Sequence, residues 1–179
     1  MEPKKHNLFL LLKTQRRILL TVLQHNIIVV LMDLQFQDDG NLIPGIHFLH
    51  WPEFEQRFGS DPHRRRLLNG LRQMLLKLAS AGCETAYIDG SFVSEKPIPT
   101  DFDGAWELKN VDLQRLLAIE PVFFDFSNKR TAQKRKYLGE MFPADTVEAG
   151  SGRTFIEFFQ QDKQTGTPKG VVAIDLRTL

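Results

Sequence analysis

The chain has 179 residues, of which 42% are hydrophobic and 25% are charged, with a formal net charge of +1. This length suits one domain with a full core and excludes two domains of ordinary size. The balanced charge excludes a general polyanion binder, whereas local basic clusters can still contact phosphate. The single cysteine, Cys83, excludes a disulfide framework and a Cys-rich zinc site. It fits a buried structural thiol and the cytoplasmic location that we expect.

Residues 1–31 differ in character from the rest of the chain. Two apolar runs, at 8–12 and 18–31, are separated by a basic segment. Both runs are shorter than the roughly 20 apolar residues of a membrane span, and the basic residues argue against a signal peptide. We therefore expect no membrane association. Two interpretations are open: an amphipathic helix followed by a short strand or helix, docked on the domain or on a second subunit, or an appendage outside a single domain over 32–179.

Helix signals dominate the next part of the chain. Residues 51–58 predict a short helix closed by a glycine. Asp61 and Pro62 are typical of a helix start, and a leucine-rich stripe extends this second helix over 62–81. The basic cluster at 63–66 opposes the helix dipole in the first turn. Phosphate or nucleic-acid contact and a solvated or ion-paired face are both open explanations for it.

The strongest chemical signal follows. A strand leads into Gly90-Ser91, and after nine intervening residues the chain returns through Asp101 and Asp103 on a second strand. Strand side chains alternate between faces, so these two carboxylates point the same way about 7 Å apart. Mg²⁺ favours one or two carboxylates together with substrate phosphates, and the backbone N–H groups of a Gly-Ser turn suit a phosphate. The pattern predicts a site for a metal ion and a triphosphate.

This arrangement of Gly-Ser, nine residues and Asp-x-Asp resembles the signature of the DNA polymerase β-like nucleotidyltransferase superfamily, especially its minimal members. The resemblance implies that Asp101 and Asp103 bind two Mg²⁺ ions, with Mn²⁺ as a substitute, and that Gly90 and Ser91 hold the β- and γ-phosphates. Gly104 departs from the usual apolar residue and predicts a loosened strand end. The remainder of the chain looks closer to bacterial proteins of unassigned role with this fold, some of which accompany toxin-antitoxin or defence loci.

A third acid is implied by the same resemblance, on a strand beside the Asp-x-Asp strand. The apolar run 121–126 reads as a strand buried on both faces, and Asp125 stands alone in it. We choose Asp125 as the residue that helps to activate the acceptor hydroxyl. Capping of the following turn by Asp125 is an open alternative. Glu157 and Asp175, each among apolar neighbours in a β-hairpin predicted over 154–176, are alternative third acids.

Basic residues supply the other candidate phosphate contacts. Lys96 lies in the loop between the two halves of the motif. Lys129 and Arg130 open the most basic part of the chain, which continues on a helix to Leu138. Lysine and arginine in such positions bind triphosphate or a nucleic-acid backbone, and a solvated helix is the open alternative. The predicted nucleotide-binding residues are therefore Gly90, Ser91, Lys96, Lys129 and Arg130.

The predicted elements define the fold class. They are helix 62–81, strand 84–89, strand 101–108, helix 111–119, strand 121–126, a basic helix to 138 and the hairpin. This order predicts an α/β or α+β fold, with a small mixed sheet flanked by helices, nucleotidyltransferase-like and ending in a C-terminal β-hairpin.

The leading functional hypothesis is a Mg²⁺-dependent nucleotidyltransferase. It would move a nucleoside monophosphate from a nucleoside triphosphate to a hydroxyl of a protein, an RNA end such as that of tRNA, or a small molecule. A second hypothesis is a non-catalytic module of the same fold that binds a partner protein, as in toxin-antitoxin pairs. A third is a two-metal nuclease built from the same acids. The nucleotide, the acceptor and the oligomeric state stay open.

Overall fold

The computed structural model describes residues 18–22, 28–32 and 34–179. The chain divides into two compact units, Met1–Gln35 and Phe36–Leu179. In the first unit, β1 (Ile18–Val22) and β2 (Ile28–Met32) form an antiparallel ribbon. The amphipathic helix considered for the start of the chain lies outside the described residues. In the part of the chain that is described, no helix combines the length and the apolar character needed to cross a membrane.

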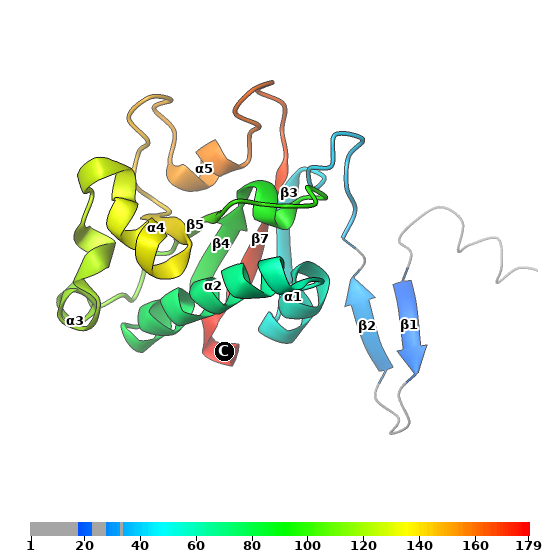
Figure 1. Cartoon of the computed structure of the whole chain (residues 1–179), viewed down its shortest axis with the longest axis horizontal. Helices are drawn as coiled ribbons and strands as arrows, with labels where there is room; N and C mark the ends of the chain where they lie inside the picture. The colour runs from blue at the N-terminus through cyan, green and yellow to red at the C-terminus, as the bar shows by residue number, and fades with distance from the viewer. Residues whose placement is uncertain (1–17, 23–27, 33) are drawn as a thin grey trace, which may run out of the picture. The chain divides into compact units, whose positions relative to one another are not determined.

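The second unit is organised around a five-stranded sheet in the order β3-β7-β4-β5-β6 (Figure 1). Its strands are β3 (Gly45–Leu49), β4 (Thr85–Asp89), β5 (Phe102–Trp106), β6 (Gly139–Pro143) and β7 (Gly170–Asp175). The outer pairs β3–β7 and β5–β6 are parallel, whereas β4 runs antiparallel to both of its neighbours. This mixed sheet with helices confirms the predicted α+β class.

Five α-helices accompany the sheet: α1 (Trp51–Phe58), α2 (Pro62–Ser80), α3 (Leu113–Ile119), α4 (Thr131–Tyr137) and α5 (Phe155–Phe159). The long helix α2 begins where the sequence predicts, because the Asp61 carboxylate accepts a hydrogen bond from the Arg64 backbone N–H at 2.9 Å. Its leucine stripe is buried, and Figure 1 shows α2 crossing one face of the sheet.

The opposite face of the sheet carries a second apolar cluster. Tyr87, Ala105 and Phe142 are register partners on β4, β5 and β6, and they pack with Phe155 and Phe159 of α5. The Phe142 and Phe155 rings stack with centroids 4.2 Å apart. Because side chains alternate along a strand, residues two positions away from this row, at the strand ends, share its face. The candidate functional residues stand there.

The predicted strand over 121–126 is wrong. Pro121–Phe124 forms a 3₁₀ turn, η3, and only Phe123 in it is buried. Phe126 is 60% exposed, so the run is not covered on two faces. A short apolar run has no periodicity of its own, and proline at the first position favours a helical turn as readily as the start of a strand.

The predicted C-terminal hairpin is also not formed. Phe155–Phe159 is the helix α5, and Thr154 and Glu157 form a capping box at its start. Only the second arm of the predicted hairpin is a strand, β7, and it pairs with β3 and β4 in the middle of the sheet. Two short strands, β3 and β6, were not predicted at all.

Gly104 does not loosen its strand. It lies inside β5, buried, with Ile88 and Met141 as register partners. A Cβ atom at this position would lie 2.7 Å from the carbonyl oxygen of Tyr87, so glycine allows the close approach of β4 and β5. The prediction of a loosened strand end was wrong. Cys83 is buried, as predicted, and burial raises the pKa of its thiol to about 12.

Candidate functional site

Three acids line up across the sheet at one end of β4, β5 and β6. Asp89 is the register partner of Asp103, and Asp103 is the register partner of Glu140. Register partners on adjacent strands point to the same face, so this row shares its face with the α5 cluster. Asp101 lies directly before β5 and accepts a hydrogen bond from the Thr100 hydroxyl at 3.0 Å.

The Gly90-Ser91 turn follows β4 directly and lies against this row. Gly90 has φ +80°, a left-handed conformation that glycine adopts without strain. A Cβ atom on Gly90 would lie 3.2 Å from Asp103 Oδ2. The turn continues as the 3₁₀ segment η2 (Gly90–Val93), in which Phe92 and Val93 are buried. Glycine is therefore favoured at position 90 both by the backbone conformation and by the close approach to the Asp103 carboxylate.

A cleft of about 770 Å³ opens over the turn. Its lining includes the predicted residues Gly90, Ser91, Lys96 and Asp103, whereas Asp101 is not part of it. The lining also includes Asp89 and the loops 38–41 and 162–164, together with Lys169. Two basic residues of the cleft, Lys163 and Lys169, were not predicted from the sequence. The structure thus brings the turn, one acid of the motif and three lysines to one cavity.

Lys169 forms a buried ion pair at the floor of the cleft. Its Nζ lies 2.5 Å from Asp89 Oδ1, and both side chains are almost fully buried. Burial raises the pKa of Asp89, and the charge of Lys169 opposes that rise. Lys169 stands directly before β7, which pairs with β4. Because β7 runs antiparallel to β4, this position lies beside the end of β4 where the Gly-Ser turn begins, and the sequence carried no local signal for that pairing.

The surroundings of Asp103 disfavour its negative charge. Burial, together with the charges of Asp101, Glu140 and Asp89, raises its pKa to about 6, and Lys163 acts in the opposite direction. Negative charge is therefore crowded at this end of the sheet in a partly desolvated place. A cation bound here would relieve that crowding.

Glu140 occupies the position that the family resemblance assigns to a third acid. It lies on β6, the parallel neighbour of β5, directly opposite Asp103. Lys134 of α4 holds its carboxylate at 2.6 Å, and the Glu140 side chain is 12% exposed. We missed Glu140 because Gly139–Pro143 is a five-residue strand bounded by glycine and proline. The one signal in the sequence was the alternation of Glu140 with the apolar Met141.

The three acids considered earlier lie elsewhere. Asp125 follows η3, and its carboxylate accepts hydrogen bonds from the Ser127 hydroxyl and backbone N–H, which lower its pKa. The strand on which its assignment depended does not exist. Glu157 is exposed in the capping box of α5. Asp175 ends β7 opposite Thr85, at the other end of β4 from Asp89.

The predicted basic residues separate into two groups. Lys96 lines the cleft, whereas Lys129 and Arg130 do not. These two residues and Asn128 have positive φ values of 54°, 55° and 46° respectively, in a left-handed turn before α4. The Arg130 guanidinium lies over the Phe142 ring, 4.2 Å from its centroid, and over the ring of Phe126. It packs on the aromatic cluster beside Glu140 rather than in the cleft.

The acids at this end of the sheet match Mg²⁺ in chemical type. Asp101, Asp103 and Glu140 offer the carboxylate oxygens that this ion prefers, and the raised pKa of Asp103 marks a place where positive charge is favoured. Within residues 18–22, 28–32 and 34–179, no three His, Cys, Asp or Glu side chains are already grouped as a metal site. Side-chain rotation, including release of Glu140 from Lys134, would be needed to gather them.

Comparisons with known proteins give one result. Neither the curated proteins nor the solved structures contain a match. One family model matches residues 34–175, a span that includes the whole lining of the cleft and Glu140. The chain therefore belongs to DUF6932, a family of unknown function.

Proposed function

We propose that the protein is a Mg²⁺-dependent nucleotidyltransferase that transfers a nucleoside monophosphate from a nucleoside triphosphate to a hydroxyl acceptor. One observation carries the proposal: the Gly90-Ser91 turn, Asp103 and three lysines line one cleft of about 770 Å³. Anion-binding amides and lysines beside a crowded row of carboxylates are the parts that binding a magnesium triphosphate requires. The resemblance of the Gly-Ser and Asp-x-Asp spacing supports the same reaction.

The roles of the residues follow from their positions. The backbone N–H groups at Gly90 and Ser91 would hold the terminal phosphates, and Lys96 and Lys163 would neutralise their charge. Lys169 is already paired with Asp89, so we assign it to fixing the start of the turn. Asp101, Asp103 and Glu140 would hold Mg²⁺, which when bound neutralises charge on the phosphates and aligns them.

The reaction is an in-line displacement at the α-phosphorus. The acceptor hydroxyl oxygen forms a bond to the α-phosphorus, and the bond from that phosphorus to the oxygen bridging to the β-phosphate breaks. Pyrophosphate leaves with the electron pair. Glu140, once released from Lys134, accepts the hydroxyl proton in our proposal. Glu140 thus replaces Asp125 as the proposed third acid.

Label transfer from each of the four α-labelled nucleoside triphosphates tests the proposal, with Mg²⁺ and with separate protein and RNA acceptor fractions. Asp103→Asn should lower transfer by roughly a hundredfold or more, while Asp175→Asn, at the other end of the sheet, should not change it. Glu140→Gln should lower transfer strongly and Asp125→Asn should not. Wild-type transfer that survives Asp103→Asn unchanged would contradict the proposal.

A second candidate function is a non-catalytic module that binds a partner protein. It is favoured by the internal neutralisation of two acids of the row, Asp89 by Lys169 and Glu140 by Lys134. Such pairs leave less negative charge for an added cation. This candidate predicts that the wild-type protein transfers no label from any nucleotide and that Asp103→Asn leaves partner binding intact.

A further inference from the structure

We propose that Arg64 and the first turn of α2 form a clamp that positions the Gly90-Ser91 turn and Lys96 for the triphosphate. Arg64 is then a positioning residue, since it acts through the backbone of the segment it holds. The proposal deepens the proposed function, and its consequences for nucleotide binding rest on that function. That Arg64 holds this segment in place rests only on the hydrogen bonds that it donates.

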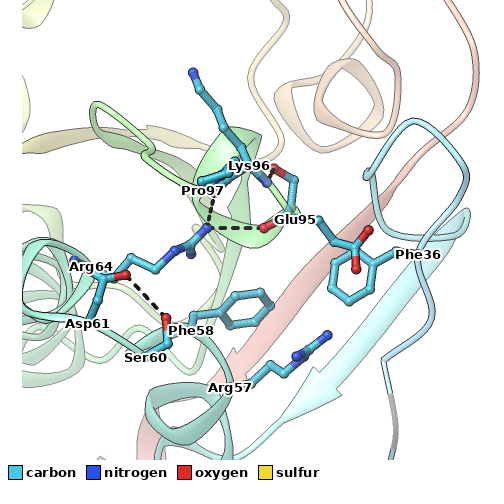
Figure 2. A pocket seen from close by; sticks show the side chains of 10 residues that line it. Phe36, Arg57, Phe58, Ser60, Asp61, Arg64, Glu95, Lys96 and Pro97 are labelled. Carbon is cyan, nitrogen blue, oxygen red and sulfur yellow. Dashed lines mark hydrogen bonds between the residues drawn. The ribbon is translucent and has the colours of Figure 1, made fainter.

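The Arg64 guanidinium donates to three backbone carbonyls of the segment 92–101, which links the Gly-Ser turn to β5. Its Nη1 lies 2.7 Å from the oxygen of Phe92, and its Nη2 lies 3.2 Å from that of Ser94 and 2.6 Å from that of Lys96. Figure 2 shows the side chain reaching from α2 toward the backbone at Lys96 and Pro97. The first of these carbonyls belongs to Phe92, directly after the Gly-Ser turn, and the last belongs to Lys96.

Arg64 is an unusual residue for this position because it is buried. It is 6% exposed, its guanidinium lies 5.5 Å from the centroid of the Phe92 ring, and burial lowers its pKa. Burying a charge is unfavourable unless hydrogen bonds compensate it. The carbonyl oxygens supply that compensation, so the guanidinium and the segment depend on each other. Arg64 therefore lies neither on a solvated helix face nor in a position to contact phosphate, because its guanidinium is bonded to backbone carbonyls.

Outside the contacts with α2, the segment is held at one further point on another loop, where the Glu95 backbone N–H donates to the Gly40 carbonyl oxygen at 2.9 Å. No helix or strand covers residues 94–101, which connect η2 to β5. His63, the neighbour of Arg64, contacts the Pro99 carbonyl oxygen through Nε2 at 2.6 Å. A cavity of about 300 Å³ lies beside the segment, lined by Phe58, Arg64 and Pro97 among others (Figure 2). Side chains do not fill that space, so the hydrogen bonds from the first turn of α2, together with the Glu95–Gly40 bond, hold the segment in place.

The clamp explains two of the four basic residues at the start of α2, His63 and Arg64. Basic side chains oppose the helix dipole there, but Arg64 and His63 point their nitrogens at carbonyl oxygens of the segment rather than at solvent. The first turn of α2 thereby contacts the connection between Gly90-Ser91 and Asp101 at several points along its length. A loosened connection would change the phosphate turn and the first acid of the motif together.

The test compares Arg64→Ala and Arg64→Lys with Arg66→Ala and Arg66→Lys, because Arg66 is an exposed residue on the same helix. The first readout is amide hydrogen exchange of residues 93–96. The second is the dissociation constant of each magnesium nucleoside triphosphate and of the matching nucleoside. Free guanidinium at a low, non-denaturing concentration is then added to Arg64→Ala.

Both Arg64 variants should raise exchange over 93–96 by roughly tenfold or more, since each removes charge-assisted hydrogen bonds or their geometry. They should weaken triphosphate binding about tenfold while nucleoside binding changes little, and guanidinium should partly restore Arg64→Ala. The Arg66 variants should match wild type. Unchanged exchange in a folded Arg64→Lys protein would overturn the clamp, as would equal weakening of triphosphate and nucleoside. Wild-type protein that binds no triphosphate would overturn the proposed function instead, and exchange would still decide the clamp.

Discussion

The strand pair β4–β7 ends in the same kind of charged pair on both sides, in opposite surroundings. At the cleft, Lys169 and Asp89 lie 2.5 Å apart with side chains 9% and 3% exposed. At the other end, Arg177 and Asp175 lie 2.8 Å apart with side chains 66% and 31% exposed. Burial raises the pKa of Asp89, whereas hydrogen bonds from Arg177 lower the pKa of Asp175 to about 2. Access of water distinguishes the two ends.

The two ion pairs differ in what stability can explain. An exposed pair has little effect on stability, and a buried pair is often no better than apolar residues of the same size. The buried pair at the cleft is therefore not explained by stability alone. It lies beside a turn and a row of acids that suit a triphosphate and a cation, and this agrees with a functional role for that end of the sheet.

The largest expected effect comes from breaking the buried pair. Lys169→Met leaves the Asp89 carboxylate buried without its partner, and we expect a loss of about 3–5 kcal/mol in the free energy of unfolding. Arg177→Met at the exposed end should change stability little. Urea unfolding of both variants measures the difference. Asp89→Asn combined with Lys169→Met should recover much of the loss, and a mild effect of Lys169→Met would remove the contrast between the two ends.

The pH dependence of stability sharpens the same contrast. The folded-state pKa of Asp103, about 6, lies above the 3.8 of an exposed aspartate, because of burial and neighbouring acids. The folded state therefore holds this proton more tightly, and the resulting stability is present below pH ~4 and lost as pH rises through ~6. The loss should approach ~3 kcal/mol at most.

Urea unfolding between pH ~4 and ~7.5 measures this loss as a difference between wild type and Asp103→Asn, which lacks the titrating group. Asp175→Asn is the matched control. The pKa of Asp175 is depressed, so its stability contribution is lost only as pH falls toward 2, outside the window. A constant difference between wild type and Asp103→Asn across the window would show that Asp103 is not crowded by negative charge.

The smallest effect concerns the turn. Gly90→Ala and Gly152→Ala both place a side chain at positive φ, +80° and +71°, and each should lower stability by about 1–2 kcal/mol. Only at position 90 does the new Cβ atom approach a carboxylate oxygen, at 3.2 Å, while nothing lies within 4 Å of it at position 152. The free energy of unfolding and the affinity for nucleotide should therefore both be lower in Gly90→Ala than in Gly152→Ala. Equal behaviour of the two variants would contradict the proposed approach of the turn to Asp103.

The sequence predicts those elements whose ends carry their own signals. Asp61 and Pro62 mark the start of α2, and its leucine stripe fixes the buried face. Asp112 similarly caps α3, near the predicted start. The capping box of Thr154 and Glu157 was present in the sequence as well, yet we interpreted its apolar neighbours as a strand. A stronger weight on capping residues would have identified α5.

The parts that could not be predicted depend on tertiary contacts. β6 is a five-residue strand whose identity comes from pairing with β5, and Glu140 enters the row only through that pairing. Lys169 and Arg64 are ordinary basic residues in the sequence. Burial against Asp89 in one case, and against three carbonyls in the other, gives them their roles. No local pattern specifies such long-range partners.

The central claim is that the Asp103 end of the sheet is a site for a cation and a triphosphate. Measuring cation binding tests this claim most directly. Electron paramagnetic resonance can follow free Mn²⁺ during titration of the protein, with and without each nucleoside triphosphate. We predict that wild type and Asp175→Asn bind Mn²⁺ more tightly when nucleotide is present, by the same amount, and that Asp103→Asn loses this binding. Mn²⁺ and nucleotide binding by Asp103→Asn at wild-type affinity would contradict the account.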